Sequence, residues 1–305
     1  MVVTHLASQL GVEVAHLARA YSQVGAIVVV NQAAKRSTFD LTLTKTNTYV
    51  ADAYITDDEF DNPGLWDPAK TTGYRPWSWP DLCNLPARIA EAVDTWDLSH
   101  PVCAALGLEH LQEDWLLGQI ESLDMVEGQE LANMTFEDVA LSPGFGLGLR
   151  PKEVAPDATR LRVAVCGVRR WLERVVVPAQ NVLIDLPHLQ QRNPWLLNGD
   201  RQEIDAWNRV VGRWAPDEPP VLPEAFNRSA SQLLGRNVWN VRQVPPRPAG
   251  ERVQPSDPVF CEDTSLFVPM DSARGFLSNV EGSQARRYVS KVNGVTYSPP
   301  TRLMR

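Results

Sequence analysis

The stretch GDRQEIDAWNRVVGRWA, residues 199–215, carries a complete helix pattern. Asp200 is a favourable N-cap residue, and Glu203 follows three positions later as in a capping box. Apolar side chains then recur three or four positions apart, at Ile204, Trp207, Val211 and Trp214. The stretch therefore predicts an amphipathic helix with one buried face.

Other segments of the chain predict both helices and strands. Helical spacing recurs at residues 4–25, with Thr4 as N-cap, and at 85–96, 99–108, 109–125 and 222–235, where Ser99 would cap the third of these. Period-two alternation predicts strands at residues 38–44, 48–56, 160–168 and 237–244, and a strand-length apolar run ends at Val30. Two hairpins are expected, one joining 38–44 to 48–56 and one turning at Asn293-Gly294.

These patterns predict an α+β fold with mixed helices and antiparallel hairpins. A doubly wound nucleotide-binding fold is not expected, because strands and helices do not alternate regularly. Residues 242–258 hold five prolines and few apolar side chains, which predicts an extended arm near the C-terminus. The glycine- and proline-rich segment 142–152 suggests a boundary between an N-terminal α+β region, residues 1–145, and a C-terminal one, residues 146–305.

The composition is that of a globular protein. Of 305 residues, 44% are apolar and 22% charged, which is enough to bury a core without disulfides. The four cysteines show no CxxC spacing, so we expect reduced thiols that are mostly buried. No apolar run approaches the roughly 18 residues that span a bilayer, and no export signal opens the chain, so no membrane contact is expected.

Charge is divided unevenly along the chain. Residues 51–140 hold 3 basic and 19 acidic side chains, whereas the remaining residues hold 26 basic and 18 acidic ones. An acidic third of this kind either serves as a solvated face or meets a basic surface on a neighbouring subunit. The overall charge of −8 argues against nonspecific binding of nucleic acid by the whole surface, although a basic tail leaves some contact with nucleic acid open.

No motif in the sequence identifies an active site, so no catalytic, cofactor-binding or metal-binding residue is expected. The glycines at 144, 146 and 148 are followed by Pro151 rather than by a phosphate-binding helix. Asp185 and His188 could meet after a turn, as many Asp-His pairs do. Two further groups could in principle bind a cation but lack a recognised spacing: Cys83, His100, Cys103 and His110, and the acidic cluster Asp57, Asp58, Glu59 and Asp61.

An aromatic segment, residues 62–83, crowds three tryptophans, a tyrosine and four prolines into 22 positions. Its rings could stack on a ligand, pack into the protein's own core or anchor a neighbouring copy of the chain. Tryptophan, tyrosine and arginine dominate interface hot spots. The hypothetical interface residues are therefore Trp66, Tyr74, Arg75, Trp77 and Trp79 in this segment, and Arg242, Arg247 and Arg252 in the arm.

Together these features predict a structural subunit of a large self-assembling particle, a viral capsid or other virion protein made in the host cytoplasm. Its partners would be copies of itself and other virion proteins, and its action would need no covalent chemistry. Two other classes stay open. One is an enzyme whose cleft is lined by acidic residues near 57–61 and 109–114 with His100 or His110. The other is a carbohydrate- or nucleotide-binding module that uses the tryptophans of residues 62–83.

Overall fold

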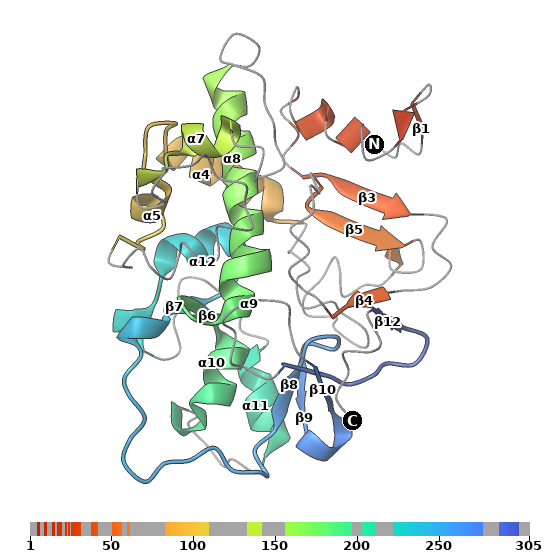
Figure 1. Cartoon of the computed structure of the whole chain (residues 1–305), viewed down its shortest axis with the longest axis vertical. Helices are drawn as coiled ribbons and strands as arrows, with labels where there is room; N and C mark the ends of the chain where they lie inside the picture. The colour runs from red at the N-terminus through yellow and green to blue at the C-terminus, as the bar shows by residue number, and fades with distance from the viewer. Residues whose placement is uncertain are drawn as a thin grey trace.

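Helices and strands both occur throughout the computed structural model (Figure 1), which confirms the α+β class. The structure describes residues 83–109, 133–141, 156–196, 203–211, 222–276 and 287–298, and shorter pieces between residues 5 and 61. The helices are α4 (Leu85–Thr95), α5 (Val102–Ala105), α7 (Phe136–Leu141), α8 (Asp157–Trp171), α9 (Val177–Ala179), α10 (Leu186–Arg192), α11 (Ile204–Val211) and α12 (Arg228–Leu234). Shorter turns are the π-helix η5 (Leu172–Val176) and the 3₁₀ helices η6 (Pro194–Leu196), η7 (Pro223–Ala225), η8 (Val241–Gln243) and η9 (Met270–Ser272).

The strands are short, and most of them pair with partners distant in sequence. They are β1 (His5–Leu6), β2 (Gln9–Leu10), β3 (Val28–Asn31), β4 (Thr38–Asp40), β5 (Ala53–Thr56), β6 (Leu183–Asp185), β7 (Val238–Asn240), β8 (Val259–Cys261), β9 (Leu266–Val268), β10 (Arg274–Phe276), β11 (Arg287–Val289) and β12 (Thr296–Ser298). The largest sheet has four strands in the order β10-β11-β8-β9, with β11 and β8 parallel and the other pairs antiparallel.

Helix α8 runs through the middle of the molecule (Figure 1) and is buried along almost its whole length. The prediction of a strand at residues 160–168 is therefore wrong. A helix that is covered on all sides has no polar face, so the 3.6-residue period disappears from its sequence. The alternation of small and β-branched residues that remains resembles a strand.

A π-helical turn, η5, follows α8, and its cause lies in the sequence. Pro178 has no amide hydrogen to donate to the preceding turn, and its ring crowds the backbone there. The wider turn accommodates the ring, and the amide of Val177 donates to the carbonyl of Leu172, five residues back. The helix ends at Ala179, and Gln180 adopts a left-handed conformation with φ of 55°.

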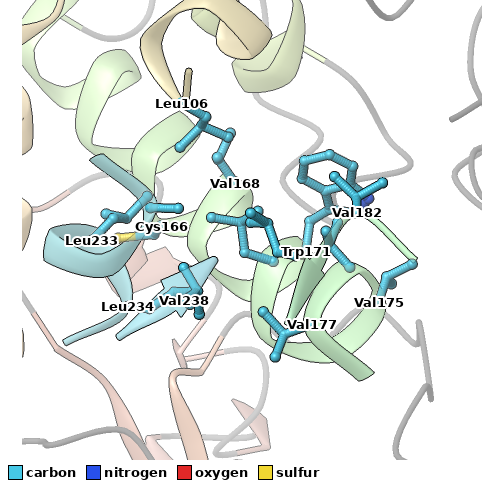
Figure 2. Close-up of a cluster of buried hydrophobic side chains, with 14 of the residues drawn as sticks. Leu106, Cys166, Val168, Trp171, Val175, Val177, Val182, Leu233, Leu234 and Val238 are labelled. Atoms are coloured by element: carbon cyan, nitrogen blue, oxygen red, sulfur yellow. The ribbon is translucent and has the colours of Figure 1, made fainter. Parts of the chain in front are cut away.

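The main core surrounds α8 and η5 (Figure 2). Apolar side chains of α12 and β7 pack there against α8, with Leu106 after α5 and with the turns of η5 and α9. The same buried cluster extends from Phe39 to Tyr297 and so draws on both halves of the chain. The division into regions 1–145 and 146–305 stays a prediction.

Among the residues that the structure describes, neither predicted hairpin is present. β4 pairs in parallel with β12, and β5 pairs in parallel with β3, so the two arms of the first hairpin lie in different sheets. The Asn293-Gly294 turn exists, with Gly294 at φ of 83°, but β11 and β12 on either side of it also belong to different sheets. Pairing with distant strands therefore prevails over local turn preference, because strand pairing depends more on tertiary context than on local propensity.

The helix predicted at residues 4–25 is wrong in its first part, where β1 and β2 pair with each other. Among the described residues of this range, helix occurs at 14, 15 and 17–19. Ser99 is also not a cap, because Pro101 occupies the N-cap position of α5 and Ser99 donates its hydroxyl and amide to Asp97 instead.

Three other helix predictions are confirmed at α4, α11 and α12. α4 buries Leu85, Ile89 and Ala92, and α11 buries Trp207. The predicted strand at 237–244 is confirmed at β7. The proposed N-cap Asp200 and the expected helix beyond residue 109 lie outside the described residues. Within the described part of the chain, no helix is long and apolar enough to cross a membrane.

Candidate functional site

A chain of five buried charged side chains links the middle of the molecule to the four-stranded sheet. We call it the buried charge chain; its members, in order of contact, are Arg236, Asp185, His188, Glu262 and Arg287. Their side chains are between 0% and 8% exposed. Positive and negative groups alternate along it, which is the arrangement that makes burial of charge tolerable.

The residues around position 185 determine the geometry of Asp185 and His188 in the buried charge chain. Asp185 is the last residue of β6 and the N-cap of α10, where its carboxylate accepts a hydrogen bond from the amide of His188 at 3.4 Å. Pro187 occupies the first turn of the helix, which fixes the backbone angle and leaves no unsatisfied amide there. The imidazole of His188 consequently lies over its own cap, and its Nδ1 contacts Oδ1 of Asp185.

Segments that are distant in sequence supply the other members of the buried charge chain, Glu262 and Arg287. Nε2 of His188 lies 2.8 Å from Oε1 of Glu262, which follows β8. The same oxygen lies 2.9 Å from a guanidinium nitrogen of Arg287 in β11. Arg287 also donates to the carbonyl oxygen of Pro178 at 2.7 Å, near the C-terminal end of α9, where the helix carries partial negative charge.

The geometry fixes the protonation of His188. Both ring nitrogens face carboxylate oxygens, and a neutral imidazole has only one N–H, so only the imidazolium satisfies both contacts. Burial by itself would lower the pKa of His188, but the charges of Asp185 and Glu262 outweigh it and raise the pKa above its usual value. Burial opposes ionisation of Asp185 too, yet His188 and the nearby arginines hold the pKa of that carboxyl well below its usual range.

The sequence suggested that Asp185 and His188 could meet, and the structure brings them together with a second carboxylate from 74 residues later in the chain. His188 and Asp185 have side chains only 3% exposed and that of Glu262 is 0% exposed. This arrangement can hold a proton in the interior of the protein. It also joins β6 and α10 to the four-stranded sheet. We assign it a structural role.

A second buried network ties the N-terminal segment to α8. The carboxylate of Asp52 contacts Arg19 at 2.5 Å and Arg169 at 3.4 Å, and it accepts a hydrogen bond from the amide of Ile27 at 2.7 Å. Arg169 also pairs with Glu173 in η5 at 2.8 Å. A completely buried carboxylate thus has two cations and one amide as partners, so this network too fastens the core.

The residues that the sequence indicated for metal binding do not form a group in the described part of the chain. Cys83 is exposed, whereas Cys103 is buried in α5. Burial, with a smaller contribution from Glu109, raises the pKa of Cys103 to about 11, so its thiol keeps its proton at neutral pH. His110 lies outside the described residues. No group of three or more potential metal ligands occurs among the residues that the structure describes.

Only some of the residues expected to line an enzyme's cleft are among those that the structure describes. Asp61 and Glu109 are exposed and His100 is partly exposed, whereas Asp57, Asp58, Glu59 and residues 110–114 are outside the described ranges. The glycines at 144, 146 and 148 are outside them as well. All four cysteines are free, and three of them are buried, as the sequence predicted.

The hypothetical interface residues divide into two groups. Trp66, Tyr74, Arg75, Trp77 and Trp79 lie outside the described residues, so their contacts stay a prediction. Arg247 and Arg252 lie in the arm and Arg242 lies in the 3₁₀ turn η8 just before it, and all three are exposed. No protein-family model, curated protein or solved structure matches the chain. Function must therefore be inferred from the geometry of its surface and interior.

The arm, residues 244–258, leaves the body after η8 and returns at β8 without forming a helix or strand (Figure 1). Most of its residues are exposed, including Val253 at 45%. The guanidinium of Arg247 lies 5.2 Å from the centre of the Trp195 ring. Within the arm, the amide of Glu251 donates to the carbonyl of Pro248 at 3.1 Å and the amide of Gln254 donates to the carboxylate of Asp257 at 2.7 Å. An exposed segment with a fixed course is suited to contact another molecule.

Acidic side chains gather at the opposite end of the molecule. We call this surface the acidic end and define it by the exposed residues Glu91, Asp94, Asp97 and Glu109, which lie on and just beyond α4 and α5. α4 has no basic residue in its last turn, so the negative end of the helix adds to the carboxylates. The arm lies toward the other end of the longest axis (Figure 1).

Proposed function

We propose that the chain is a structural subunit of a large self-assembling particle, a viral capsid or other virion protein, which acts through contacts between copies. The observation that carries this proposal is a pair of exposed surfaces of opposite charge on one chain, the arginines in and just before the arm and the carboxylates of the acidic end. The arm carries three exposed arginines, at 242, 247 and 252, counting the one in the 3₁₀ turn that precedes it.

These two surfaces favour contact between copies. The arm begins beside α5, because Asn240 and Asn227 connect Gln243 to the carbonyl of Leu106. Its later part leads away from α4 and α5 (Figure 1) and can meet the acidic end of the next copy. Opposite charges on the two surfaces would steer that encounter and fix its register. Such a contact joins two different surfaces, so it repeats from copy to copy until a ring closes or a filament extends.

The interior is consistent with a structural role. Both buried networks of charged side chains are covered from solvent and join elements that are distant in sequence. A subunit that bears load in a particle gains from such connections, because a buried charge pair is costly to separate.

The test is sedimentation velocity of three proteins in low salt. The wild type should form species much heavier than its 34.0 kDa chain. Arg242→Glu combined with Arg252→Glu reverses charge in the arm and should shift the sedimentation profile toward the monomer. Arg228→Glu changes an exposed arginine outside the arm, at the first position of α12, and should sediment as the wild type does.

Circular dichroism spectra of the three proteins should superimpose, because none of the three arginines is buried. Negative-stain images of the heavy wild-type species should show rings, shells or filaments of regular width. A wild type that remains a monomer at every concentration would refute the proposal, as would an arm variant that assembles as readily as Arg228→Glu.

A further inference from the structure

The arm contains a short segment with the character of a polyproline II helix, Val244–Pro248. Val244 has φ of −68° and ψ of 125°, close to polyproline II values. Three of the next four residues are prolines, whose rings fix φ, and each residue that precedes a proline is biased toward the same region. The segment is therefore already in the conformation in which proline-rich ligands bind, and little entropy is lost on docking.

The two edges of this segment are used differently. A polyproline II helix has three residues per turn, so Pro245 and Pro248 share one edge and Arg247 lies on another. Arg247 stacks on Trp195 of the body, 5.2 Å from the ring centre, and this contact holds the segment in place. Pro245 and Pro248 are exposed. The proline edge is thus presented to solvent by a segment that is anchored through its other side.

Partners that recognise polyproline II segments present aromatic rings, and arginines beside the prolines call for carboxylates. The acidic end has both. Trp96, the residue after α4, is partly exposed, and its ring is stacked on the fully buried ring of Phe136 at a centroid distance of 5.2 Å. Asp94 and Asp97 flank it and are exposed, and hydrogen bonds from Ser99 keep the pKa of Asp97 below its usual value.

We infer that the proline edge of the arm in one copy packs against Trp96 of a second copy, while Arg242 and Arg252 pair with Asp94 and Asp97. This inference rests on the proposed self-assembly and names the surface that accepts the arm. A rigid, stacked tryptophan offers a flat apolar platform, and the carboxylates beside it select for a basic proline-rich segment. Charge complementarity between the two surfaces, both exposed on the same chain, makes a second copy the occupant.

A competition experiment with peptides tests this contact. A peptide of residues 241–254 is added to the assembled full-length chain, and the mass of the assembly is followed by light scattering. The peptide occupies the acceptor without carrying an acidic end of its own, so it should break the assembly down toward 34 kDa. A peptide with alanine at 245, 246 and 248 has the same charge but no polyproline bias, and about tenfold more of it should be needed.

Two variants of the acceptor complete the experiment. Trp96→Phe keeps an aromatic ring on Phe136 and should still assemble, whereas Trp96→Ala should not, with the folding of both checked by thermal unfolding. If the wild type assembles but both peptides act equally, or neither acts, the arm-to-Trp96 contact is refuted while self-assembly stands. If the wild type does not assemble at all, the proposed function fails and this inference fails with it.

Discussion

Replacing Glu262 with glutamine should show how much the buried charge chain contributes to stability. Glu262 is completely buried and lies 2.8 Å from His188 and 2.9 Å from Arg287, whose side chain is also completely buried. The substitution keeps the shape of the side chain but removes the charge that compensates two buried cations. Breaking a buried ion pair by removing one partner costs about 3–5 kcal/mol, and we expect a loss in that range.

The dependence on pH gives the same reasoning a second, independent readout. The pKa of His188 is raised on folding, so its stabilising contribution is complete below its unfolded value of about 6.5 and is lost as pH rises through the folded value. The pKa of Asp185 is lowered, so its contribution is present above about 3.9 and is lost as pH falls. These two groups together favour the folded state most between those limits.

Urea unfolding at pH steps from 5 to 9 measures both the cost of Glu262→Gln and the pH dependence that comes from His188. Above pH 6.5 the free energy of unfolding of the wild type should fall by up to about 1.4 kcal/mol per pH unit because of His188. The free energy of unfolding of His188→Gln should not show that fall. His100→Gln is the matched control, because the side chain of His100 is 45% exposed and is not a member of the buried charge chain. Its free energy of unfolding should change with pH as that of the wild type does. A cost for Glu262→Gln below about 1 kcal/mol, or equal slopes for wild type and His188→Gln, would refute the reasoning.

Further predictions concern the packing around α8 and α12. Gly235→Ala places a methyl group 2.1 Å from the guanidinium of Arg88, at a residue with a left-handed φ of 69°. It should therefore lower the free energy of unfolding by more than about 1 kcal/mol. In a double-mutant cycle, adding Arg88→Ala should recover only the steric part of that loss. Asn227→Ala removes the N-cap of α12 and the donor to the carbonyl of Leu106, and chemical denaturation should show a loss of about 2 kcal/mol. Asn227→Asp keeps the cap acceptor but turns an oxygen toward the acceptor oxygens of Leu106 and Asn240, so it should not recover the loss. Asp52→Asn removes the carboxylate that lies 2.5 Å from Arg19 and 3.4 Å from Arg169, both of them buried, and should lower the thermal midpoint clearly. An unchanged midpoint would contradict the account of that network.

Local patterns in the sequence were good guides where a helix has one buried face. α4, α11 and α12 each keep a polar side, so their 3.6-residue period is visible in the sequence. α8 was predicted as a strand because it has no polar side to reveal its period. The arm could be recognised from its prolines, since these residues act on the backbone directly and need no distant partner.

Contacts between distant segments could not be predicted. The parallel pairs β3-β5 and β4-β12 replace the hairpins that the turns indicated, and nothing in a turn specifies such partners. For the buried charge chain, the sequence indicated Asp185 with His188, because an N-cap and the third helical residue are neighbours in any helix. Glu262 and Arg287 could not be added, since their approach depends on how β8 and β11 pack against α10.

The central claim, self-assembly through oppositely charged ends, is tested most directly by the mass of the full-length chain in solution at low and at high salt. Multi-angle light scattering at about 0.05 M salt should give a mass of many subunits, and the mass should fall toward 34 kDa at about 1 M salt, where charges beyond about 3 Å are screened. A mass of 34 kDa under both conditions would contradict the account.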